Sequence, residues 1–424
     1  MTGSIDEFPP RGGVVHCEDV PLPAIAEAVG TPVFVYSTAS MRGQARRLRA
    51  ALGALDEPLI AYAVKANPNG AVLATLAVEG LGADVVSGGE YRRALAAGIA
   101  ADRIVFSGVG KTRAEMALAL DGGLYQFNLE SVAEAEMLSE VAVARGVRAP
   151  VALRVNPDVA AGSHAKISTG GAQDKFGVAL ADAADACARI RELPGLNLQG
   201  VAVHIGSQLP SLQPLEAAFA KLGVLIADLR RAGHDIRTAD LGGGLGVMYD
   251  AAAAALPRME AYGEMVARVT AGWNVRLIFE PGRLIVGQAG VLLTEVIRTK
   301  PGPERPFVIV DAAMNDLMRP TLYDAWHAID AVAPTGERMT ADIVGPVCET
   351  GDTFARGRDT DRVRAGALMI IRTAGAYAAT MGSTYNSRAL APEVLVNGSE
   401  WAVVRERREP DELAPDRLPA WIAR

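Results

Sequence analysis

The feature that most constrains this chain is an alternation of short apolar segments and alanine-rich, helix-periodic segments that begins at Leu59 and ends near Arg283. Eight β-prone runs with helices between them, over about 225 residues, match the usual size of a (β/α)8 barrel. The runs are almost continuously apolar, which is typical of a parallel sheet covered by helices. We therefore predict an α/β fold built on a TIM-like barrel, with a doubly wound open sheet as the alternative. The eight runs are 59–65, 82–87, 104–108, 124–128, 150–156, 198–206, 238–243 and 276–282.

Polar or glycine-rich motifs follow most of these runs directly. Barrel enzymes carry their active sites at the carboxyl ends of the strands, so a barrel predicts this placement. Motifs scattered over a surface would not fall so regularly. The motifs are Lys65, Ser87-Gly88-Gly89-Glu90, Asn156-Pro157-Asp158, His204-Ile205-Gly206-Ser207-Gln208, Gly242-Gly243-Gly244-Leu245-Gly246 and Glu280-Pro281-Gly282-Arg283.

The segments on either side of the barrel indicate a second, mainly β domain, a small barrel or sandwich. Short β-like pieces occur within 14–36, and five strand-like runs after Arg283 are separated by Gly, Pro and Asp turns. We expect the early pieces to join the later ones. The predicted domains are therefore 1–36 and 285–424 in the β domain and 37–284 in the barrel. The later runs are Val291–Thr299, Pro306–Asp311, Ala341–Val347, Ala367–Arg372 and Glu400–Glu406.

Composition excludes several classes of function. The 424 residues, 50% hydrophobic and 21% charged, suit a soluble globular protein, and a net charge of -7 argues against a nucleic-acid partner. Cys17, Cys187 and Cys348 show neither metal spacing nor a disulfide framework, so we expect a reducing cytoplasm. The amino-terminal residues lack the features of a signal peptide, and no apolar run reaches the ~18 residues of a membrane span. Because the histidines form no HxH or HExxH motif, we expect no metal site.

Lys65 is the first candidate for chemistry. It ends an apolar run, and the Asn67-Pro68 pair beyond it turns the chain away. An ammonium at the end of a core strand is costly to bury, so burial favours the neutral, nucleophilic amine, which can hold an aldehyde as a Schiff base. The alternative is a lysine that extends from the strand end into water.

Three further features complete a possible pocket. The glycines of Gly242–Gly246 let backbone N–H groups approach an anion, although a simple tight turn is the alternative. Glu280 could keep a pyridine nitrogen protonated, or it could pair with Arg283 as a structural salt bridge. His204 could stack on a flat ring, although a lone histidine is more often a core residue. With Lys65, these features describe a pocket for pyridoxal 5'-phosphate.

The sequence resembles the bacterial diaminopimelate decarboxylases, of the alanine-racemase-like (fold type III) pyridoxal phosphate enzymes. The resemblance covers nearly the whole chain, and its later motifs are specific to the decarboxylase. The matching stretches are YAVKAN at 62–67, DVVSGGE at 84–90, FSGVGK at 106–111, RVNPDV at 154–159, KISTG at 166–170, KFG at 175–177, HIGSQL at 204–209, LGGGLG at 241–246, EPGR at 280–283, VDAAMNDLMRPTLYDAWH at 310–327, GPVCETGD at 345–352, GAYAATMGSTYNSR at 375–388 and EVLVNG at 393–398.

The resemblance implies roles at the matching positions. Lys65 would form the Schiff base with the cofactor, and Cys348 would donate a proton; the alternative for Cys348 is a small buried hydrophobe, as expected of Cys17 and Cys187. The other cofactor contacts would be Asp84, His204, Ser207, Gly243, Gly244, Glu280, Gly282, Arg283 and Tyr377. The substrate contacts would be Arg283, Arg319, Tyr323 and Tyr377, with Glu349 binding an ammonium group.

The resemblance also implies an activity and an assembly. We expect decarboxylation of meso-2,6-diaminopimelate at its D-centre to L-lysine and carbon dioxide, the last step of lysine biosynthesis. The non-reacting end of this diamino acid carries both charges, which an arginine and a glutamate can pair. Family members are homodimers with shared active sites, in which the segment 345–352 comes from the neighbouring subunit and the segment 166–170 lies in a loop that closes over the pocket.

Three alternatives remain open at this point. One is a decarboxylase of another basic amino acid, such as D-ornithine or L-lysine. Another is a barrel that carries the cofactor without catalysis, which would need no β domain with Cys348 and Glu349. The last is an amino-acid racemase on the same fold.

Overall fold

The computed structural model describes residues 8–160, 174–250, 252, 254–413 and 417–422. The chain forms two compact units. We call the first the barrel unit; it comprises the described parts of Met41–Met248 and Ala253–Ile285. The second, the β unit, comprises the described parts of Met1–Ser40, Tyr249–Ala252 and Val286–Arg424.

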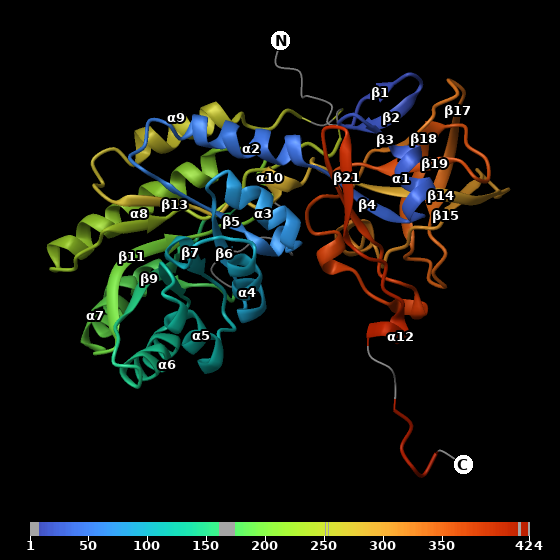
Figure 1. The fold of residues 1–424 in the computed structure, drawn as a ribbon. Helices are drawn as coiled ribbons and strands as arrows, with labels where there is room; N and C mark the ends of the chain where they lie inside the picture. Colours follow the sequence, from blue (N-terminus) through green and yellow to red (C-terminus); the bar gives the residue numbers. More distant parts are fainter. Residues whose placement is uncertain (1–7, 161–173, 251, 253, 414–416, 423–424) are drawn as a thin grey trace. The chain divides into compact units, whose positions relative to one another are not determined.

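Eight parallel strands of the barrel unit form a closed ring (Figure 1). The ring closes because β8 pairs with both β7 and β9, for example through Phe127 and Val151. This closure confirms the (β/α)8 barrel and excludes the open sheet. The short strand β10, Val178–Ala179, pairs outside the ring with β9. The eight strands are β5 Leu59–Ala63, β6 Gly82–Val85, β7 Ile104–Phe106, β8 Gln126–Leu129, β9 Ala149–Asn156, β11 Leu196–Val203, β12 Thr238–Asp240 and β13 Arg276–Phe279.

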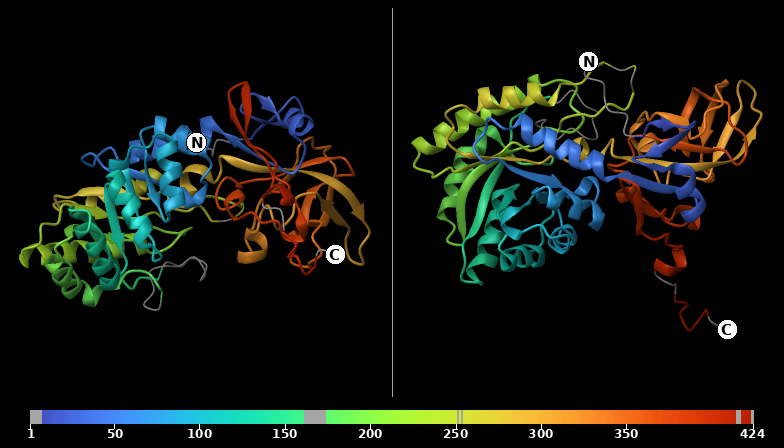
Figure 2. Two further views of the ribbon diagram at one scale, coloured as in Figure 1. Left: turned by 60° about the horizontal axis from the view of Figure 1, so that its bottom comes forward. Right: turned by 45° about the horizontal axis from the view of Figure 1, so that its top comes forward.

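Helices cover the outside of the strands, as both views in Figure 2 show. Three of them begin at a serine or threonine that is followed three residues later by glutamate: Ser87, Thr112 and Ser131. Each side-chain oxygen accepts a backbone N–H of the first turn. At Thr112 the carboxylate of Glu115 also accepts the backbone N–H of Thr112, which completes a capping box. The helices are α2 Thr38–Ala51, α3 Gly70–Val78, α4 Gly88–Ala96, α5 Arg113–Gly122, α6 Val132–Val143, α7 Ala183–Glu192, α8 Gln213–Arg231 and α9 Met259–Val269.

The β unit contains a nine-stranded sheet and a three-stranded sheet. An early segment of the chain joins the later strands, because β4, Val33–Ser37, lies between β14 and β20 in the large sheet. The large sheet consists of β4, β14 Gly290–Lys300, β15 Phe307–Val310, β16 Ile329–Ala331, β17 Arg338–Val344, β18 Thr353–Asp361, β19 Leu368–Ile371, β20 Glu393–Asn397 and β21 Glu400–Arg405. The small sheet consists of β1 Pro10–Arg11, β2 Val14–Cys17 and β3 Val20–Pro21.

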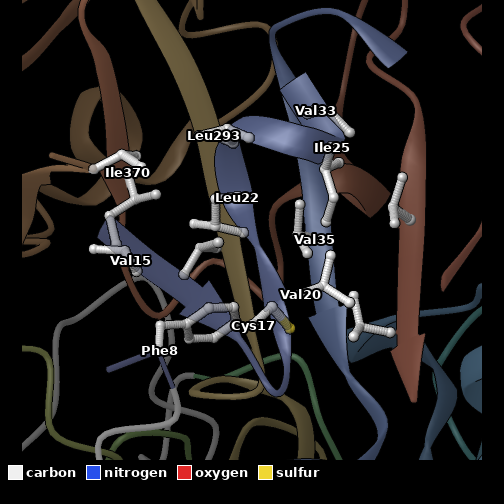
Figure 3. Close-up of a cluster of buried hydrophobic side chains, with 14 residues drawn as sticks. Phe8, Val15, Cys17, Val20, Leu22, Ile25, Val33, Val35, Leu293 and Ile370 are labelled. Carbon is white, nitrogen blue, oxygen red and sulfur yellow. The ribbon is translucent and has the colours of Figure 1, made fainter. Parts of the chain in front are cut away.

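The core of the β unit joins segments that lie far apart in the sequence (Figure 3). Helix α1, Leu22–Val29, places Leu22 and Ile25 against side chains of the large sheet, including Leu293 and Ile370. Cys17 lies in this core, and Cys187 is buried in α7, so both are the small buried hydrophobes expected from the sequence. In the described parts of the chain, no helix combines the length and apolarity needed to cross a bilayer.

Candidate active site

Lys65 lies just past the carboxyl end of β5. The strand is buried throughout and ends at Ala63, and a single 3-10 turn, Val64–Ala66, follows. The Lys65 Nζ donates to Asp84 Oδ2 of the neighbouring strand β6 at 2.7 Å. The lysine side chain is 37% exposed, and the carboxylate that its amine contacts is fully buried.

A buried pair of carboxyl groups lies at the ends of the adjacent strands β12 and β13. Asp240 is the last residue of β12, and Glu280 directly follows β13. Burial, followed by the charges of Asp240 and Asp84, raises the pKa of Glu280 well above that of an exposed glutamate, and the charge of Lys65 opposes this shift. Burial also raises the pKa of Asp240.

The glycine turn after β12 fits closely against its neighbours. Gly242 and Gly244 have φ values of +65° and +123°, which favour glycine. A β-carbon on Gly243 would overlap the carbonyl of Glu280, and one on Gly244 would lie 2.6 Å from the carbonyl oxygen of Gly206. Backbone atoms therefore line this turn and leave no room for a side chain at Gly243 or Gly244.

His204, Ser207 and Arg283 surround the glycine turn. The Nδ1 of His204 accepts the backbone N–H of Gly243 at 3.2 Å. Burial, assisted by the charges of Arg154 and Lys65, lowers the pKa of His204 well below that of an exposed histidine. The ring is therefore neutral, with its proton on Nε2. The buried guanidinium of Arg283 donates to Ser207 Oγ, with its Nε and Nη2 at 3.4 and 3.3 Å.

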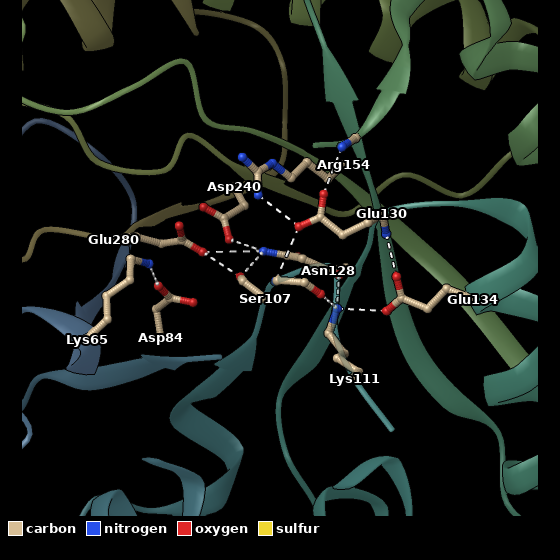
Figure 4. Close-up of polar contacts among 12 residues, drawn as sticks. Lys65, Asp84, Ser107, Lys111, Asn128, Glu130, Glu134, Arg154, Asp240 and Glu280 are labelled. Atoms are coloured by element: carbon tan, nitrogen blue, oxygen red, sulfur yellow. Dashed lines mark hydrogen bonds and ion pairs between the residues drawn. The ribbon is translucent and has the colours of Figure 1, made fainter. Parts of the chain in front are cut away.

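Buried ion pairs fix the loop after β8 beside this site (Figure 4). Arg154 of β9 binds Glu130 at 2.8 Å, and the fully buried Lys111 binds Glu134 at 2.7 Å. Glu134 also accepts the backbone N–H of Glu130. Because each of these buried charges has an opposite charge beside it, the pairs can hold the strand ends without leaving an isolated ion.

In the β unit, Arg319 begins helix α11, Arg319–Tyr323. The guanidinium is buried, stacks 4.4 Å from the centre of the Tyr249 ring, and bonds His327 Nε2 through Nη1 at 2.9 Å. His327 Nδ1 faces the backbone carbonyl of Arg372 at 2.8 Å, so it carries the ring proton and Nε2 accepts. Arg319 is thus a buried, oriented cation, as is Arg283, and neither is an exposed solubilising charge.

Cys348 and Glu349 lie on an exposed loop after β17. Asp352 organises this loop, because its carboxylate accepts the backbone N–H groups of Val347 at 2.7 Å and Met314 at 2.6 Å. The backbone N–H of Cys348 donates to Asn386 Oδ1 at 3.0 Å. The exposure of Cys348 excludes the alternative of a small buried hydrophobe.

Comparisons with known proteins agree with these features. Residues 39–287 match the family model of the pyridoxal-dependent decarboxylases, pyridoxal binding domain. Over 411 residues, 96% of this chain and 98% of the relative, the chain is 56% identical to a diaminopimelate decarboxylase of Zymomonas mobilis. The chain belongs to the diaminopimelate decarboxylase family. It is a pyridoxal phosphate-dependent decarboxylase, and the closed barrel is the fold of its relatives.

Solved structures of the diaminopimelate decarboxylase family share the fold of this chain. The enzyme of M. jannaschii in complex with L-lysine has a TM-score of 0.93 at 34% identity and covers 97% of this chain and 98% of its own. The enzyme of Helicobacter pylori in complex with L-lysine has a TM-score of 0.89 at 36% identity, with 92% and 98% covered. The similarity thus spans both units of the chain.

The barrel unit of this diaminopimelate decarboxylase family member fits pyridoxal 5'-phosphate. The backbone cradle at Gly243 and Gly244 has no room for a β-carbon, which suits the phosphate. The buried Asp84 Oδ1 has no hydrogen-bond partner, although Oδ2 binds Lys65. A β-carbon on Gly282 would lie 3.1 Å from the β-carbons of Ala63 and Ala66, which stand two positions before Lys65 and one position after it. Among the described residues, no cluster of His, Cys, Asp or Glu is suited to hold a metal ion.

The structure places the residues predicted from the sequence in two groups. The barrel unit brings together those at the strand ends, and the β unit carries the others. The first group is Lys65, Asp84, His204, Ser207, Gly243, Gly244, Glu280, Gly282 and Arg283. The second group is Arg319, Tyr323, Cys348, Glu349 and Tyr377; Tyr377 is half-buried with a left-handed φ of +53°. The predicted closing loop at 166–170 lies outside the described residues.

Sequence reasoning missed three polar residues of the barrel, Ser107, Asn128 and Asp240. Each is buried at the carboxyl end of a strand or directly after it. Ser107 and Asn128 both bond Glu280 Oε1, at 3.1 and 3.4 Å. The rule that located the other residues, polar groups where apolar runs end, could have found them.

Proposed function

We propose that this chain removes carbon dioxide from the D-configured centre of meso-2,6-diaminopimelate and releases L-lysine, the last step of lysine biosynthesis. The observation that carries the proposal is the set of groups at one end of the barrel, in a chain 56% identical to a diaminopimelate decarboxylase over 411 residues. The L-lysine bound in two related structures is the product that this reaction forms.

The barrel residues hold the cofactor in this proposal. When bound, pyridoxal 5'-phosphate takes up the electron pair that departing carbon dioxide leaves behind. Lys65 supplies the amine that attaches the cofactor, and Glu280 faces the ring nitrogen. The neutral His204 offers a flat face to the ring. The remaining contacts are Asp84, Ser207, Gly243, Gly244, Gly282, Arg283 and Tyr377.

The substrate residues pair the two charges of the non-reacting end. Arg319 presents a guanidinium whose orientation Tyr249 and His327 already fix, so it can bind a carboxylate in two-point fashion. Arg283, Tyr323 and Tyr377 complete this group. We assign the ammonium to Glu349 and the proton donor to Cys348. A substrate without the distal carboxylate would leave a buried cation unpaired, which penalises its binding.

We further propose a homodimer in which the loop 345–352 of one subunit completes the site of the other. The exposure of Cys348 and Glu349 in the single chain supports this arrangement, because groups that act on a substrate need a surrounding pocket. A cytoplasmic location remains a prediction from the three scattered cysteines.

The direct test offers the purified, cofactor-loaded enzyme meso-diaminopimelate, L-lysine and D-ornithine in separate reactions and measures carbon dioxide release. We expect rapid release from diaminopimelate and at least about a hundredfold less from the other two, because each lacks the distal carboxylate. Equal turnover of lysine and diaminopimelate would overturn the assignment of the substrate.

The same assay separates the other candidate functions. Cofactor absorbance without gas release from any diamino acid would indicate a carrier. Interconversion of enantiomers without gas release would indicate a racemase.

A further inference from the structure

Part of the barrel interior is polar, beside an apolar cluster formed by Leu59, Ala61, Val105 and Ile278. Gln126 and Asn128 alternate along β8, and Thr238 and Asp240 alternate along β12, so both pairs point inward. All four side chains are buried. Branched apolar residues usually fill this space, and buried polar groups cost free energy unless they are hydrogen-bonded. Their hydrogen bonds therefore indicate why they are present.

The acceptors in this cluster determine how its amides are oriented. Asn128 Nδ2 donates to Asp240 Oδ2 at 2.8 Å, so the amide nitrogen faces the carboxyl group. The opposite atom, Asn128 Oδ1, consequently needs a donor, which is Gln126 Nε2 at 2.9 Å. Gln126 Oε1 then accepts from Thr238 Oγ1 at 2.7 Å. Each orientation follows from the one before it.

The hydrogen bonds form a chain with a single direction, from the barrel interior toward the carboxyl pair. Asn128 Nδ2 also donates to Ser107 Oγ at 3.1 Å, and Ser107 Oγ donates to Glu280 Oε1 at 3.1 Å. Figure 4 shows Asn128 between Ser107, Asp240 and Glu280. Aligned hydrogen bonds polarise one another in a low-dielectric interior, so every donor in the series favours negative charge at its end.

The same pair is tied to the glycine turn. Asp240 Oδ1 accepts the backbone N–H of Gly242 at 2.9 Å, and the backbone N–H of Glu280 donates to the carbonyl of Gly242 at 2.8 Å. The carboxyl pair of Asp240 and Glu280 and the glycine turn are therefore linked by direct hydrogen bonds. A substitution at the start of the chain of hydrogen bonds can therefore alter the position of both the carboxyl pair and the glycine turn.

We propose that Thr238, Gln126 and Asn128 are positioning residues whose hydrogen-bond chain directs donors at Glu280, opposes the effect of burial on its carboxyl group and so favours the proton on the ring nitrogen of pyridoxal 5'-phosphate. The inference rests on the proposed role of Glu280. Gln126 does not contact the carboxyl pair directly in the described hydrogen bonds: it donates to Asn128, and its Oε1 accepts from Thr238 and, at 3.4 Å, from Gln199 Nε2, so it reaches Glu280 through Asn128. Without the chain, the proton would move from the nitrogen to the glutamate.

The test replaces Gln126 with methionine, which has similar length but neither donates nor accepts strongly. Cofactor carrying nitrogen-15 in its ring is bound to each protein, and the chemical shift of that nitrogen reports its protonation. We expect a protonated nitrogen in the wild type, an unprotonated one in Glu280→Gln, and an intermediate shift in Gln126→Met. The cofactor should bind Gln126→Met about tenfold more weakly, as expected for one lost hydrogen bond to a charged network.

Ser139→Ala is the matched control. Ser139 is buried in the same unit, and its Oγ accepts the backbone N–H of Gly195, but it lies on α6 outside the barrel interior. The Ser139→Ala variant should have a lower Tm than the wild type and an unchanged chemical shift of the cofactor's ring nitrogen. Thr238→Val removes only the first donor of the chain. It should move the nitrogen shift in the same direction as Gln126→Met but by less, and it replaces that variant in the test if Gln126→Met does not fold.

The outcomes separate this inference from the function on which it rests. If Glu280→Gln changes the nitrogen shift but the folded Gln126→Met and Thr238→Val variants match the wild type, the positioning chain is overturned and the role of Glu280 stands. If Glu280→Gln itself leaves the nitrogen unchanged, both are overturned.

Discussion

Several charged side chains of this protein are buried, and burial determines the partners that the cations need and the pKa of the acids. Arg283, Arg319 and Lys111 are cations with little exposure, and each has partners already in place. Asp240, Glu280 and Asp316 are buried acids whose pKa is raised mainly by burial. Substitutions that keep shape but change charge are therefore the informative ones at this scale.

Arg319→Lys should weaken substrate binding. A lysine keeps the charge but cannot reproduce the planar, two-point grip on a carboxylate or the stacking on Tyr249. We expect KM for diaminopimelate to rise by about tenfold to a hundredfold. Steady-state kinetics measure this effect. The control is Arg338→Lys, which alters a half-exposed arginine paired with Asp359 and Asp361 in the same unit; an equal rise in KM there would contradict the role of Arg319.

Asp316→Asn should stabilise the protein above about pH 6. Burial raises the pKa of Asp316 to about 6 from an ordinary value of 3.8. The neutral form suits the folded state, so its contribution is complete below the unfolded pKa and is lost as pH rises through about 6. The shift of about 2 units corresponds to at most about 3 kcal/mol.

The measurement is the difference in Tm between this variant and the wild type from pH 4 to pH 8. Asparagine keeps an acceptor for the backbone N–H of Ala313, which Asp316 Oδ2 binds at 2.9 Å. The exposed Asp324→Asn is the control and should show no such rise. A difference that stays constant across this range would contradict the predicted effect of burial.

At the scale of elements, apolar pattern and local capping account for most of the barrel unit. Every one of the eight predicted apolar runs overlaps a strand of the barrel, because a strand covered on both faces needs continuous apolar residues. Among the strands after Arg283, sequence reasoning missed β16, β18 and β20 of the β unit. β18 is an edge strand with a solvent-exposed centre and the sequence TFARGRDTD, so neither burial nor regular alternation marks it.

Thr112→Ala should destabilise the barrel unit by about 1 kcal/mol, the usual cost of a lost helix cap. The residue closes the capping box of α5 with Glu115, which also accepts the backbone N–H of Gly88. Thr112→Ser keeps the hydroxyl and should behave as the wild type. Denaturant unfolding followed by circular dichroism tests this; equal stability of Ala and Ser variants would show that the cap contributes nothing.

At the scale of the whole molecule, ring closure creates the polar cluster that sequence spacing could not predict. Asn128 and Asp240 lie 112 positions apart, and Ser107 and Glu280 lie 173 apart, yet both pairs are hydrogen-bonded. Lys65, Glu280 and the glycine turn could be proposed because each forms a recognisable motif. The partners of Glu280 depend on which side chains face the barrel interior, and that information appears only when the ring closes.

The proposed shared sites predict complementation between inactive subunits. Lys65→Ala and Cys348→Ser should each be inactive or nearly so alone. After dissociation and mixing in equal amounts, half of the dimers carry one intact site, so activity should recover to about a quarter of the wild type. Sedimentation of each variant as a dimer is the control. No recovery from verified mixed dimers would contradict sites built from two subunits.

The most direct test of the whole account is to locate the amine that holds the cofactor. The protein loaded with pyridoxal 5'-phosphate is reduced with borohydride, which fixes the cofactor covalently, and the labelled peptide is identified by mass spectrometry. Lys221, which donates to the backbone carbonyl of Pro157, provides a control variant, Lys221→Ala, that should label as the wild type does. The account predicts a label on Lys65 and none in Lys65→Ala; a label on another lysine, or no bound cofactor, would contradict it.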